Sequence, residues 1–563
     1  MSQTKIWDYC PGYEFDKEAD LKVATSWFWN ATQSVPPWTP MFSWFWMQYC
    51  AYGTRFAADQ LSIPTSKGWE KRVLDGCDYS AILVVRDVEE IKRREAKFKE
   101  AMRPFIEDFD AWWKPTIDEM LEHYERLKKF DPDAADNVQL FANLEDIIWV
   151  CRRMWEVHMV GMYAAYNAFI TFEGLCKDLL GIDDTSPEFH KLMAGFDNRV
   201  FQNDRALWQF GQDALKKGLG DIFLTSKPKD VVPKLEQTEA GKQWLKEFRD
   251  WLWDNGWRIS RMAEINEPSW VEDPTPAIFA IQGYLRKGGS FVLDEVRERL
   301  AKEREETTKQ LIQRVPEDQR EWFLALLNLA QKSQTYSEEH DHYLDLYTHA
   351  LIRRCCLGIG RRLVQAGTID QPDDTFYLIP DEIKRVLPCP EYHDLRHIAN
   401  RRRKEWEGWQ TKTDYPVVIT TRSGIEEAVG KDLLPSMDAI VLKVIVGALP
   451  VVRPELKADL YGTCGAPGIA EGPARVIMSF EQLVEVKPGD ILVAPTTCPS
   501  WTPVFALIGG AVIDRGGSLS HPSIVGREFG IPVVINVFEG TTKIKTGQRI
   551  KIDANQGTVH ILG

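Results

Sequence analysis

One of the ten histidines in the chain, His521, lies between a glycine pair and the start of a short helical pattern, in the stretch GGSLSHPSIVGREF. Gly516 and Gly517 permit a tight turn, and Ser520, two residues before a proline, is typical of a helix N-cap. Backbone N–H groups and the positive end of the helix dipole favour an anion at such a position. These residue types suit a histidine that carries a phosphoryl group. A histidine that only caps or packs is the competing interpretation.

A second group of polar side chains occurs in the pattern of a helix over residues 338–364. One face of this helix would present, at spacings of four, three, four and four residues, Glu338, His342, Asp345, His349 and Arg353. A solvated helix face is the competing interpretation. Three neighbouring histidines and two carboxylates also invite a comparison with metal ligands, but no spacing among them is diagnostic, and we expect no metal site.

Length, charge and cysteine usage limit the classes of function. A chain of 563 residues is too long for one hydrophobic core and predicts two or three domains. The net charge of -14 and the isoelectric point near 5.4 provide no basic field, so we expect no nucleic acid or membrane as a partner. The sequence contains neither a signal-peptide pattern nor an apolar run of about 18 residues that would span a membrane. The ten cysteines form no CxxC pair or disulfide-like framework, which predicts a reduced, cytoplasmic protein.

Two patterns of composition divide the chain. Twenty of the 21 tryptophans precede residue 462, whereas 15 of the 38 glycines fall in the last 102 residues. Helical periodicity dominates the first region, as in 88–113 and 293–315. Six runs in the second region predict strands: ARVIM, DILVA, AVIDR, PVVINV, QRIKID and GTVHIL. The predicted fold is multi-domain, with a mainly α-helical domain (1–385), a helical or mixed connector (386–455) and an α/β domain (456–563).

Four ordered blocks near the end of the chain resemble the swivelling phosphohistidine domain of the enzymes related to phosphoenolpyruvate synthase and pyruvate phosphate dikinase. They are GTCGAPGIAEGPARVI (462–477), GDILVAPTTCPSWTPVF (489–505), GGAVIDRGGSLSHPSIVGREFGIPVV (509–534) and GQRIKIDANQGTVHIL (547–562). The resemblance implies that His521 is the phosphorylated residue of the mobile domain, in a loop formed with Gly516, Gly517, Ser520 and Arg527. One departure is Leu519, because members of the family often have a threonine there on which a regulatory kinase acts. An apolar residue at this position resembles the rifampin phosphotransferases.

The phosphoryl donor is expected on another chain. Relatives that use phosphoenolpyruvate have a TIM barrel of about 250 residues after the swivelling domain, but this chain continues for only 42 residues beyond His521. We therefore do not expect phosphoenolpyruvate as a substrate. The first 385 residues contain no glycine-rich nucleotide loop and no GxxxxGK[ST] motif. We expect ATP with Mg²⁺ to bind mainly on a separate ATP-grasp subunit.

The helical region resembles the substrate domain of rifampin phosphotransferase. The shared features are an acidic, histidine-containing segment, an arginine-rich helix and a DD-x-FYL stretch, all within residues 339–383. A helical region and a phosphohistidine domain without a nucleotide-binding domain together resemble the phosphohistidine subunit of phenylphosphate synthase. That resemblance covers essentially the whole chain and implies a dikinase-type, ATP-dependent phosphotransferase of anaerobic phenol degradation. Its products would be phenylphosphate, AMP and phosphate.

The implied reaction assigns roles to the predicted helix. A phenolic hydroxyl has a pKa of about 10, so a base must take its proton as the oxygen attacks phosphorus. The candidate bases, with the carboxylates that would orient them, are His340, His342, Glu339 and Asp345. Arg353 and Arg354 are the candidates for stabilising charge on the phosphoryl oxygens. Only one residue of each pair can face the site, and the phase of the helix leaves the choice open.

An aromatic pocket would suit a phenol, since rings bind by contact area and edge-to-face geometry. The candidate pocket residues are Trp38, Met41, Tyr343 and Tyr377. Packing within helical cores is the competing interpretation for most tryptophans. Two other functions stay open: a rifampin-phosphotransferase-like enzyme for a larger hydroxylated compound, and a phosphocarrier or regulatory protein without small-molecule chemistry.

Overall fold

The computed structural model of the protein describes residues 13–183, 186–261, 263–288, 292–412, 414–422 and 454–562. The chain forms two compact units that alternate along the sequence. Unit 1 comprises Met1–Ala164, Ala263–Glu267 and Tyr343–Asp438, and unit 2 comprises Ala165–Met262, Pro268–His342 and Ala439–Gly563. The predicted connector, 386–455, lies partly outside the described residues, so the predicted domain boundaries stay predictions.

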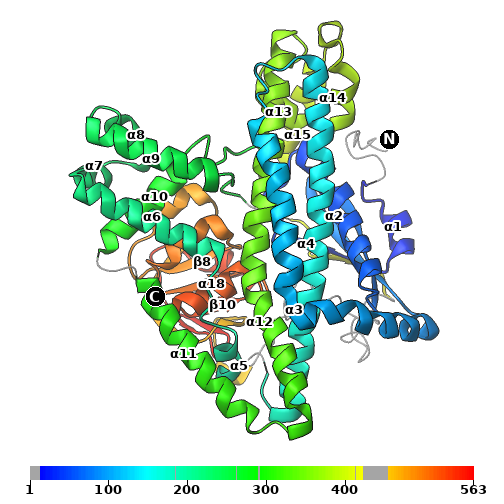
Figure 1. The fold of residues 1–563 in the computed structure, drawn as a ribbon, viewed down its shortest axis with the longest axis vertical. Helices are drawn as coiled ribbons and strands as arrows, with labels where there is room; N and C mark the ends of the chain where they lie inside the picture. Colours follow the sequence, from blue (N-terminus) through cyan, green and yellow to red (C-terminus); the bar gives the residue numbers. More distant parts are fainter. Residues whose placement is uncertain are drawn as a thin grey trace. The chain divides into compact units, whose positions relative to one another are not determined.

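Long helices form most of unit 1 (Figure 1). α3 (Val88–Lys129) and the first part of α4 (Asn137–Leu180) run antiparallel, and Arg153 of α4 donates two 2.8 Å hydrogen bonds to Glu119 of α3. The helix predicted over 88–113 is confirmed except at Asp108, whose φ of -158° and ψ of 94° divide α3 into two helical parts. The other helices of this unit are α1 (Lys17–Val23), α2 (Pro40–Gln60), α13 (Tyr347–Gln365), α14 (Pro380–Val386) and α15 (Arg396–Trp409).

Unit 1 also contains an antiparallel four-stranded sheet, in the order β2-β3-β1-β4, which the helical periodicity of this region did not predict. Its strands are β1 (Ser26–Trp29), β2 (Ser66–Leu74), β3 (Cys77–Val84) and β4 (Val418–Thr420). Asp75 and Gly76, with φ of 51° and 73°, form the turn between β2 and β3. An Asp-Gly pair is a strong local signal for a two-residue hairpin. This pair, rather than the helical periodicity of the region, indicates the hairpin of β2 and β3.

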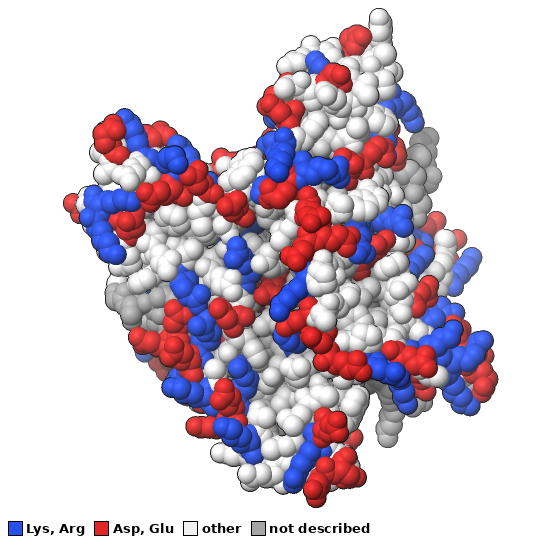
Figure 2. Space-filling view, in the orientation of Figure 1, with Lys and Arg blue, Asp and Glu red and all other residues white. Residues whose placement is uncertain are grey.

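Unit 2 begins with a series of helices. They are α5 (Pro187–Leu192), α6 (Arg199–Lys216), α7 (Gly220–Thr225), α8 (Pro228–Leu235), α9 (Glu239–Asn255), α10 (Thr275–Lys287), α11 (Val292–Ile312) and α12 (Arg320–His340). α6 to α10 enclose a core in which Trp244 and Phe248 are fully buried. The helix predicted over 293–315 is α11, and Figure 2 shows acidic and basic side chains interspersed along it, as expected of a solvated helix face.

The carboxyl-terminal part of unit 2 contains an eight-stranded sheet in the order β5-β12-β11-β7-β8-β9-β10-β6. Its strands are β5 (Leu460–Tyr461), β6 (Thr463–Ala466), β7 (Ile469–Val476), β8 (Ile491–Ala494), β9 (Gly510–Ile513), β10 (Val533–Ile535), β11 (Arg549–Asp553) and β12 (Thr558–Ile561). β7 to β10 pair in parallel, and the other pairs are antiparallel. All six runs predicted as strands are confirmed. Burial of β8 and β9 on both faces explains why they are apolar without alternation.

Three short α-helices accompany this sheet: α17 (Thr502–Phe505), α18 (His521–Phe529) and α19 (Gly540–Lys543). α18 begins at His521, directly after the N-cap Ser520, and ends at Gly530, whose φ of 66° is left-handed. The helix predicted after the glycine pair is therefore confirmed. α18 contacts β6 and β10 of the sheet and packs against α11, α12 and α17.

Two further features concern the described part of the chain. None of its helices is long and apolar enough to cross a membrane. All nine cysteines within it are free thiols, and seven of them are buried. The thiols therefore contribute to packing rather than to covalent cross-links.

A buried carboxyl group holds α18 to the helical part of unit 2. Glu528 accepts hydrogen bonds of 3.0 to 3.2 Å from the backbone N–H groups of Gly195 and Phe196. Burial raises the pKa of Glu528 to about 7, although these hydrogen bonds and the charges of Arg527 and Arg304 oppose the shift. The folded protein therefore holds a proton here at pH values at which the unfolded chain has released it.

This proton makes stability depend on pH. Because the pKa of Glu528 in the folded protein lies above its ordinary value of 4.5, the free energy of unfolding should fall as pH rises from about 4.5 to about 7. The loss should reach about 3 kcal/mol at most. Glu528→Gln keeps a neutral side chain of similar shape and should lack this part of the pH dependence.

Urea unfolding of both proteins between about pH 5 and pH 8 measures the difference. Glu539→Gln, which changes an exposed glutamate of the same unit, is the control and should retain the wild-type slope. A Glu528→Gln protein with the full wild-type slope would contradict the assignment of this proton to Glu528.

Candidate active site

His521 is the first residue of α18 and is almost completely buried, with 7% of its surface exposed. Its Nδ1 atom lies 3.0 Å from Oε2 and 3.3 Å from Oε1 of Glu338, a buried residue in the last turn of α12. A carboxylate only accepts hydrogen bonds, so Nδ1 carries the proton and donates it to Glu338. Phe505 of α17 packs edge-on against the imidazole, with ring centroids 6.1 Å apart.

The other ring nitrogen of His521, Nε2, is buried and has no hydrogen-bond partner among the described residues. With the proton on Nδ1, the lone pair of the neutral ring lies on Nε2. Nε2 is then the nucleophilic atom. Glu338 orients the ring and can stabilise the positive charge that the imidazole acquires when Nε2 forms a bond.

The loop before α18 is organised around one carbonyl group. The carbonyl oxygen of Gly517 accepts hydrogen bonds from the hydroxyl groups of Ser520 (2.7 Å) and Ser523 (2.8 Å). Gly516 has a φ of 145°, and a Cβ atom there would lie 2.7 Å from the hydroxyl oxygen of Ser520, so this position requires glycine. Ser520 thus bonds backward to the loop rather than forward to the first turn of α18. Gly516, Gly517 and Ser520 thus lie together directly before His521, and their role with a phosphoryl group stays a prediction.

Two further contacts connect α18 and its loop to α12. Arg527 donates 2.8 Å hydrogen bonds to the side chain of Gln334 and to the carbonyl oxygen of Ser518. Ser337 donates its hydroxyl proton to the carbonyl oxygen of Leu519, which is 2.9 Å away. The side chain of Leu519 is fully buried. Arg527 and Leu519 therefore hold the loop in place, so that His521 meets Glu338.

Unit 2 also contains three residues whose charges or hydrogen bonds affect one another's pKa and that no sequence motif connects. Asp204 comes from α6, Tyr284 from α10 and Arg258 from the segment between α9 and α10. Asp204 and Arg258 are each 1% exposed. No motif or regular spacing connects these positions, and the sequence signal at Asp204 is a charged residue at the helical spacing of the apolar Val200 and Leu207. Their proximity is a product of the tertiary fold.

The charges in this group shift one another's pKa. Burial raises the pKa of Asp204 to about 7, opposed by the charge of Arg258 and a hydrogen bond with Tyr284 and supported by the charge of Glu338. Burial also lowers the pKa of Arg258 to about 10, against the opposing charge of Asp204. α6, which carries Asp204, also contacts α12, which carries Glu338.

The predicted helix over 338–364 is not uniform. α12 ends at His340, residues Asp341–Leu346 form a π-helical turn, and α13 begins at Tyr347. A π turn changes the phase of every residue that follows it, so the regular polar face predicted from 3.6-residue spacing is wrong. Such turns occur frequently at functional sites.

The two candidate bases of unit 2 differ in their surroundings. His340 has its Nδ1 atom 2.7 Å from the carbonyl oxygen of Tyr336, one turn earlier in α12, and its Nε2 atom 3.1 Å from a carboxylate oxygen of Asp341. Burial lowers the pKa of His342 well below its ordinary value, and the charges of Arg258 and Arg199 lower it further. Glu339 is half-buried.

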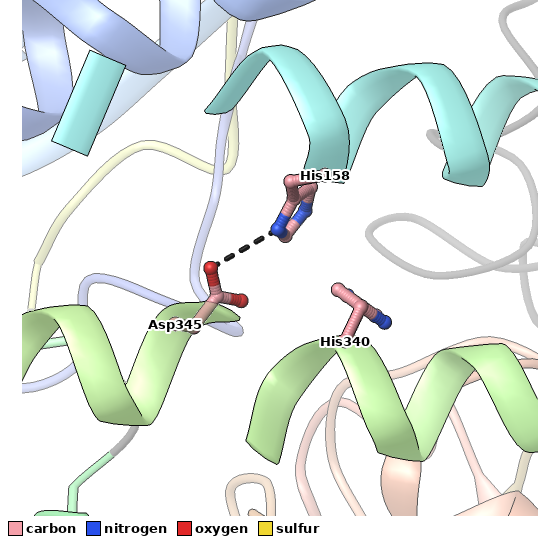
Figure 3. A group of neighbouring side chains, drawn as sticks. All are labelled: His158, His340 and Asp345. Atoms are coloured by element: carbon pink, nitrogen blue, oxygen red, sulfur yellow. Dashed lines mark hydrogen bonds and ion pairs between the residues drawn. The ribbon is translucent and has the colours of Figure 1, made fainter. Parts of the chain in front are cut away.

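The other predicted acceptor residues lie in unit 1. Asp345 accepts a 3.0 Å hydrogen bond from Nδ1 of His158 on α4, which Figure 3 shows together with His340. The buried side chain of Arg353 donates to a backbone carbonyl oxygen 3.1 Å away. Arg354 donates to the carbonyl oxygen of Phe130, directly after α3, and so stabilises the end of that helix. Catalytic roles for these residues stay predictions.

The predicted pocket residues also lie in unit 1. Trp38 is fully buried, and its ring packs against two rings of α2, with centroid distances of 5.3 and 4.9 Å. Met41 is fully buried in the first turn of α2. Tyr343 is half-buried, and the guanidinium group of Arg403 lies 4.8 Å from the ring centroid of Tyr377. Trp38 is part of an aromatic core, and contact of these residues with a substrate stays a prediction.

Two parts of the chain match protein families. Residues 156–338 match the family described as the rifampicin phosphotransferase fourth domain, and residues 486–557 match the mobile domain of PEP-utilising enzymes. Asp204, Arg258 and Glu338 fall within the first region and His521 within the second. The hydrogen bond between His521 and Glu338 therefore connects the two matched regions.

Three curated relatives are similar to the chain. A chondramide synthase of Chondromyces crocatus is 29% identical over 84% of this chain, and an uncharacterized phosphotransferase of Bacillus subtilis is 28% identical over 69%. A rifampicin phosphotransferase of Streptomyces sviceus is 25% identical over 59%. The chain spans 12%, 45% and 36% of the length of these relatives. The inferred resemblance to rifampicin phosphotransferases and to the PEP-utilising mobile domain is confirmed, whereas resemblance to phenylphosphate synthase stays a prediction.

Glu338 should determine the tautomer of His521. In the wild-type protein at a pH at which the ring is neutral, we expect the proton on Nδ1 and a bare Nε2. Glu338→Ala removes the acceptor and should shift the proton toward Nε2. The ¹⁵N NMR spectrum of the protein labelled at histidine distinguishes the two tautomers, and His521→Ala assigns the signal.

Glu321→Ala is the control, because Glu321 lies near the opposite end of α12 and is exposed. Its spectrum should match that of the wild type. Observation of the Nε2-protonated form in the wild-type protein would refute the role given to Glu338.

Proposed function

We propose that this chain is a phosphotransferase component in which His521 carries a phosphoryl group to the hydroxyl group of a small phenolic compound. The observation that supports this most directly is the buried imidazole at the start of α18, with Nδ1 directed to Glu338 and Nε2 without a partner among the described residues. An unsatisfied buried polar atom costs about 1 to 3 kcal/mol. A histidine that only packed would not need to leave Nε2 in that state.

The first half-reaction loads His521. The proposed donor is ATP with Mg²⁺, bound mainly on a separate ATP-grasp subunit. Nε2 attacks the β-phosphorus atom, the β-phosphoryl group stays on the ring, and AMP and phosphate leave as water takes the terminal phosphoryl group. The N–H groups and dipole of α18 favour the negative charge of the phosphoryl group at this position.

The second half-reaction transfers the phosphoryl group from His521 to the acceptor. The acceptor oxygen attacks phosphorus and loses its proton to a base, while the bond between phosphorus and Nε2 breaks. The electron pair returns to Nε2, and the ring becomes neutral again with its proton on Nδ1. Burial of His521 supports this sequence, because a site that excludes water protects the phosphohistidine from hydrolysis.

A phenolic acceptor is supported by the aromatic composition of the chain, in which 20 of 21 tryptophans precede residue 462. A larger hydroxylated acceptor is the second candidate, and the match of residues 156–338 to a rifampicin phosphotransferase domain favours it. Both candidates require the same attack of a hydroxyl group on phosphohistidine. We place the reaction in the reducing cytoplasm, which is consistent with the nine free cysteines among the described residues.

Labelling tests this function. The chain is mixed with a candidate ATP-grasp partner, ATP labelled in the β-phosphoryl group, and phenol. We expect label first on His521 and then in phenylphosphate, because Nε2 is the nucleophile that accepts the group. His521→Ala should incorporate no label and form no product.

His560→Ala, at a histidine of β12 in the same unit, is the matched control and should behave as the wild type. Rifampicin in place of phenol tests the second candidate in the same assay. Label that remains on the protein with every acceptor would contradict both, and product formation by His521→Ala would remove the mechanism.

A further inference from the structure

Several buried residues of unit 2 have polar atoms without a hydrogen-bond partner among the described residues, and three of them bear on this site. They are His521 at Nε2, Asp204 at Oδ2 and Arg258 at Nε and Nη1. An unsatisfied buried group is costly, and more so when it is charged. These three lie on or beside elements that pack against one another, so one bound group can satisfy all of them. That group would accept hydrogen bonds from Arg258 and donate one to Asp204.

These residues lie on elements that pack against one another. α6, which carries Asp204, contacts α12 and α17, and both of these contact α18. Phe201, one turn before Asp204, packs against Phe529 of α18 with ring centroids 5.9 Å apart. Because residues three apart lie on the same face of a helix, this face of α6 turns toward the carboxyl-terminal end of α18.

The segment of Arg258 is attached to the loop before α17. Ser500 donates a 3.0 Å hydrogen bond to the carbonyl oxygen of Ile259, the residue after Arg258. The guanidinium carbon of Arg258 lies 3.5 Å from the ring centroid of Trp270, so the planar group is stacked and held in one orientation. A fixed guanidinium fork can bind two oxygens of a phosphoryl group at once.

Glu338 interacts with both His521 and Asp204. It accepts the Nδ1 hydrogen bond of His521, and its negative charge also acts on Asp204. The groups that act on Asp204 from the elements around it are Arg258, Tyr284 and Glu338. Burial, opposed by Arg258 and Tyr284 and supported by Glu338, raises the pKa of Asp204 to about 7, which suits a group that takes up a proton during turnover.

We propose that Asp204 and Arg258 form the acceptor end of the transfer, with Arg258 binding the phosphoryl oxygens and Asp204 taking the proton of the acceptor hydroxyl. This inference rests on the proposed function and assigns residues to its second half-reaction. The bond between the acceptor oxygen and phosphorus forms as the bond between phosphorus and Nε2 breaks. The electron pair returns to Nε2, the hydroxyl proton moves to Oδ2 of Asp204, and Arg258 neutralises charge on the phosphoryl oxygens.

The test isolates the second half-reaction in the full chain. Phosphoramidate phosphorylates His521 chemically, the reagent is removed, and a phenol is added in a single turnover followed by ³¹P NMR. Phenol itself must lose a proton, whereas pentafluorophenol is already ionised at neutral pH. Asp204→Asn should therefore slow transfer to phenol about 100-fold and leave transfer to pentafluorophenol close to the wild-type rate.

Arg258→Lys keeps a positive charge but not the planar fork, and should slow transfer to both acceptors about 100-fold. Asp294→Asn and Arg314→Lys, at partly exposed positions of the same unit, are matched controls and should transfer at the wild-type rate. The wild-type rate with phenol should also rise as pH increases through about 7. This pH profile is measured on the wild-type protein, so it does not depend on whether a variant folds.

The outcomes separate the two proposals. The role of Asp204 is overturned if the wild-type protein transfers the phosphoryl group but Asp204→Asn slows transfer to both phenols equally. It is also overturned if Asp204→Asn slows transfer to neither phenol. An Arg258→Lys protein at the wild-type rate, or a flat wild-type pH profile with phenol, would overturn the acceptor pair. A wild-type chain that is charged on His521 but forms no product with either phenol contradicts the proposed function, and this inference with it.

Discussion

The hydrogen bond between Nδ1 of His521 and Glu338 is the interaction on which the rest of the site depends. It fixes the tautomer of the imidazole, and through the tautomer it decides which nitrogen can attack phosphorus. The same bond joins α18, which follows the glycine loop, to α12 of the helical part. The contacts of Arg527 with Gln334 and of Ser337 with Leu519 bring the same two elements together at neighbouring points. The glycine loop and the end of α12 together fix the position of the His521 imidazole.

Burial is the second constraint, because it makes every charge near this ring costly unless something compensates it. Unit 2 compensates in different ways at two of its buried carboxyl groups. Glu528 is satisfied by backbone N–H groups and acts as an anchor for α18, whereas Asp204 leaves one oxygen without a partner among the described residues. Both have a pKa raised to about 7. A raised pKa alone therefore does not identify a reactive group, and the unsatisfied oxygen is what distinguishes Asp204 from an anchor.

Local signals in the sequence were sufficient for the features that depend on neighbours along the chain. The six strands and the start of α18 follow from apolar runs, glycines and a serine cap, and all were predicted. Glu338 was recognised as part of a polar face, but its contact with His521 is 183 residues away in sequence. No periodic pattern in the sequence predicts a contact between residues so far apart. The positions of Asp204 and Arg258 could not be predicted for the same reason. The π turn was missed because 3.6-residue spacing cannot distinguish an α-helix from one with a single wider turn.

The choice of base can be argued from charge. Two histidines were predicted for this role, and Nδ1 of His340 is engaged by the carbonyl oxygen of Tyr336 in α12. His342 stays neutral because burial, Arg258 and Arg199 all disfavour a proton on its ring. Protonation of His342 during turnover would add a second positive charge beside Arg258, whereas protonation of Asp204 removes a negative charge from beside the incoming phosphoryl group. An acid that becomes neutral is therefore better suited than an imidazole that becomes charged, and Arg258 then remains available to the phosphoryl oxygens alone.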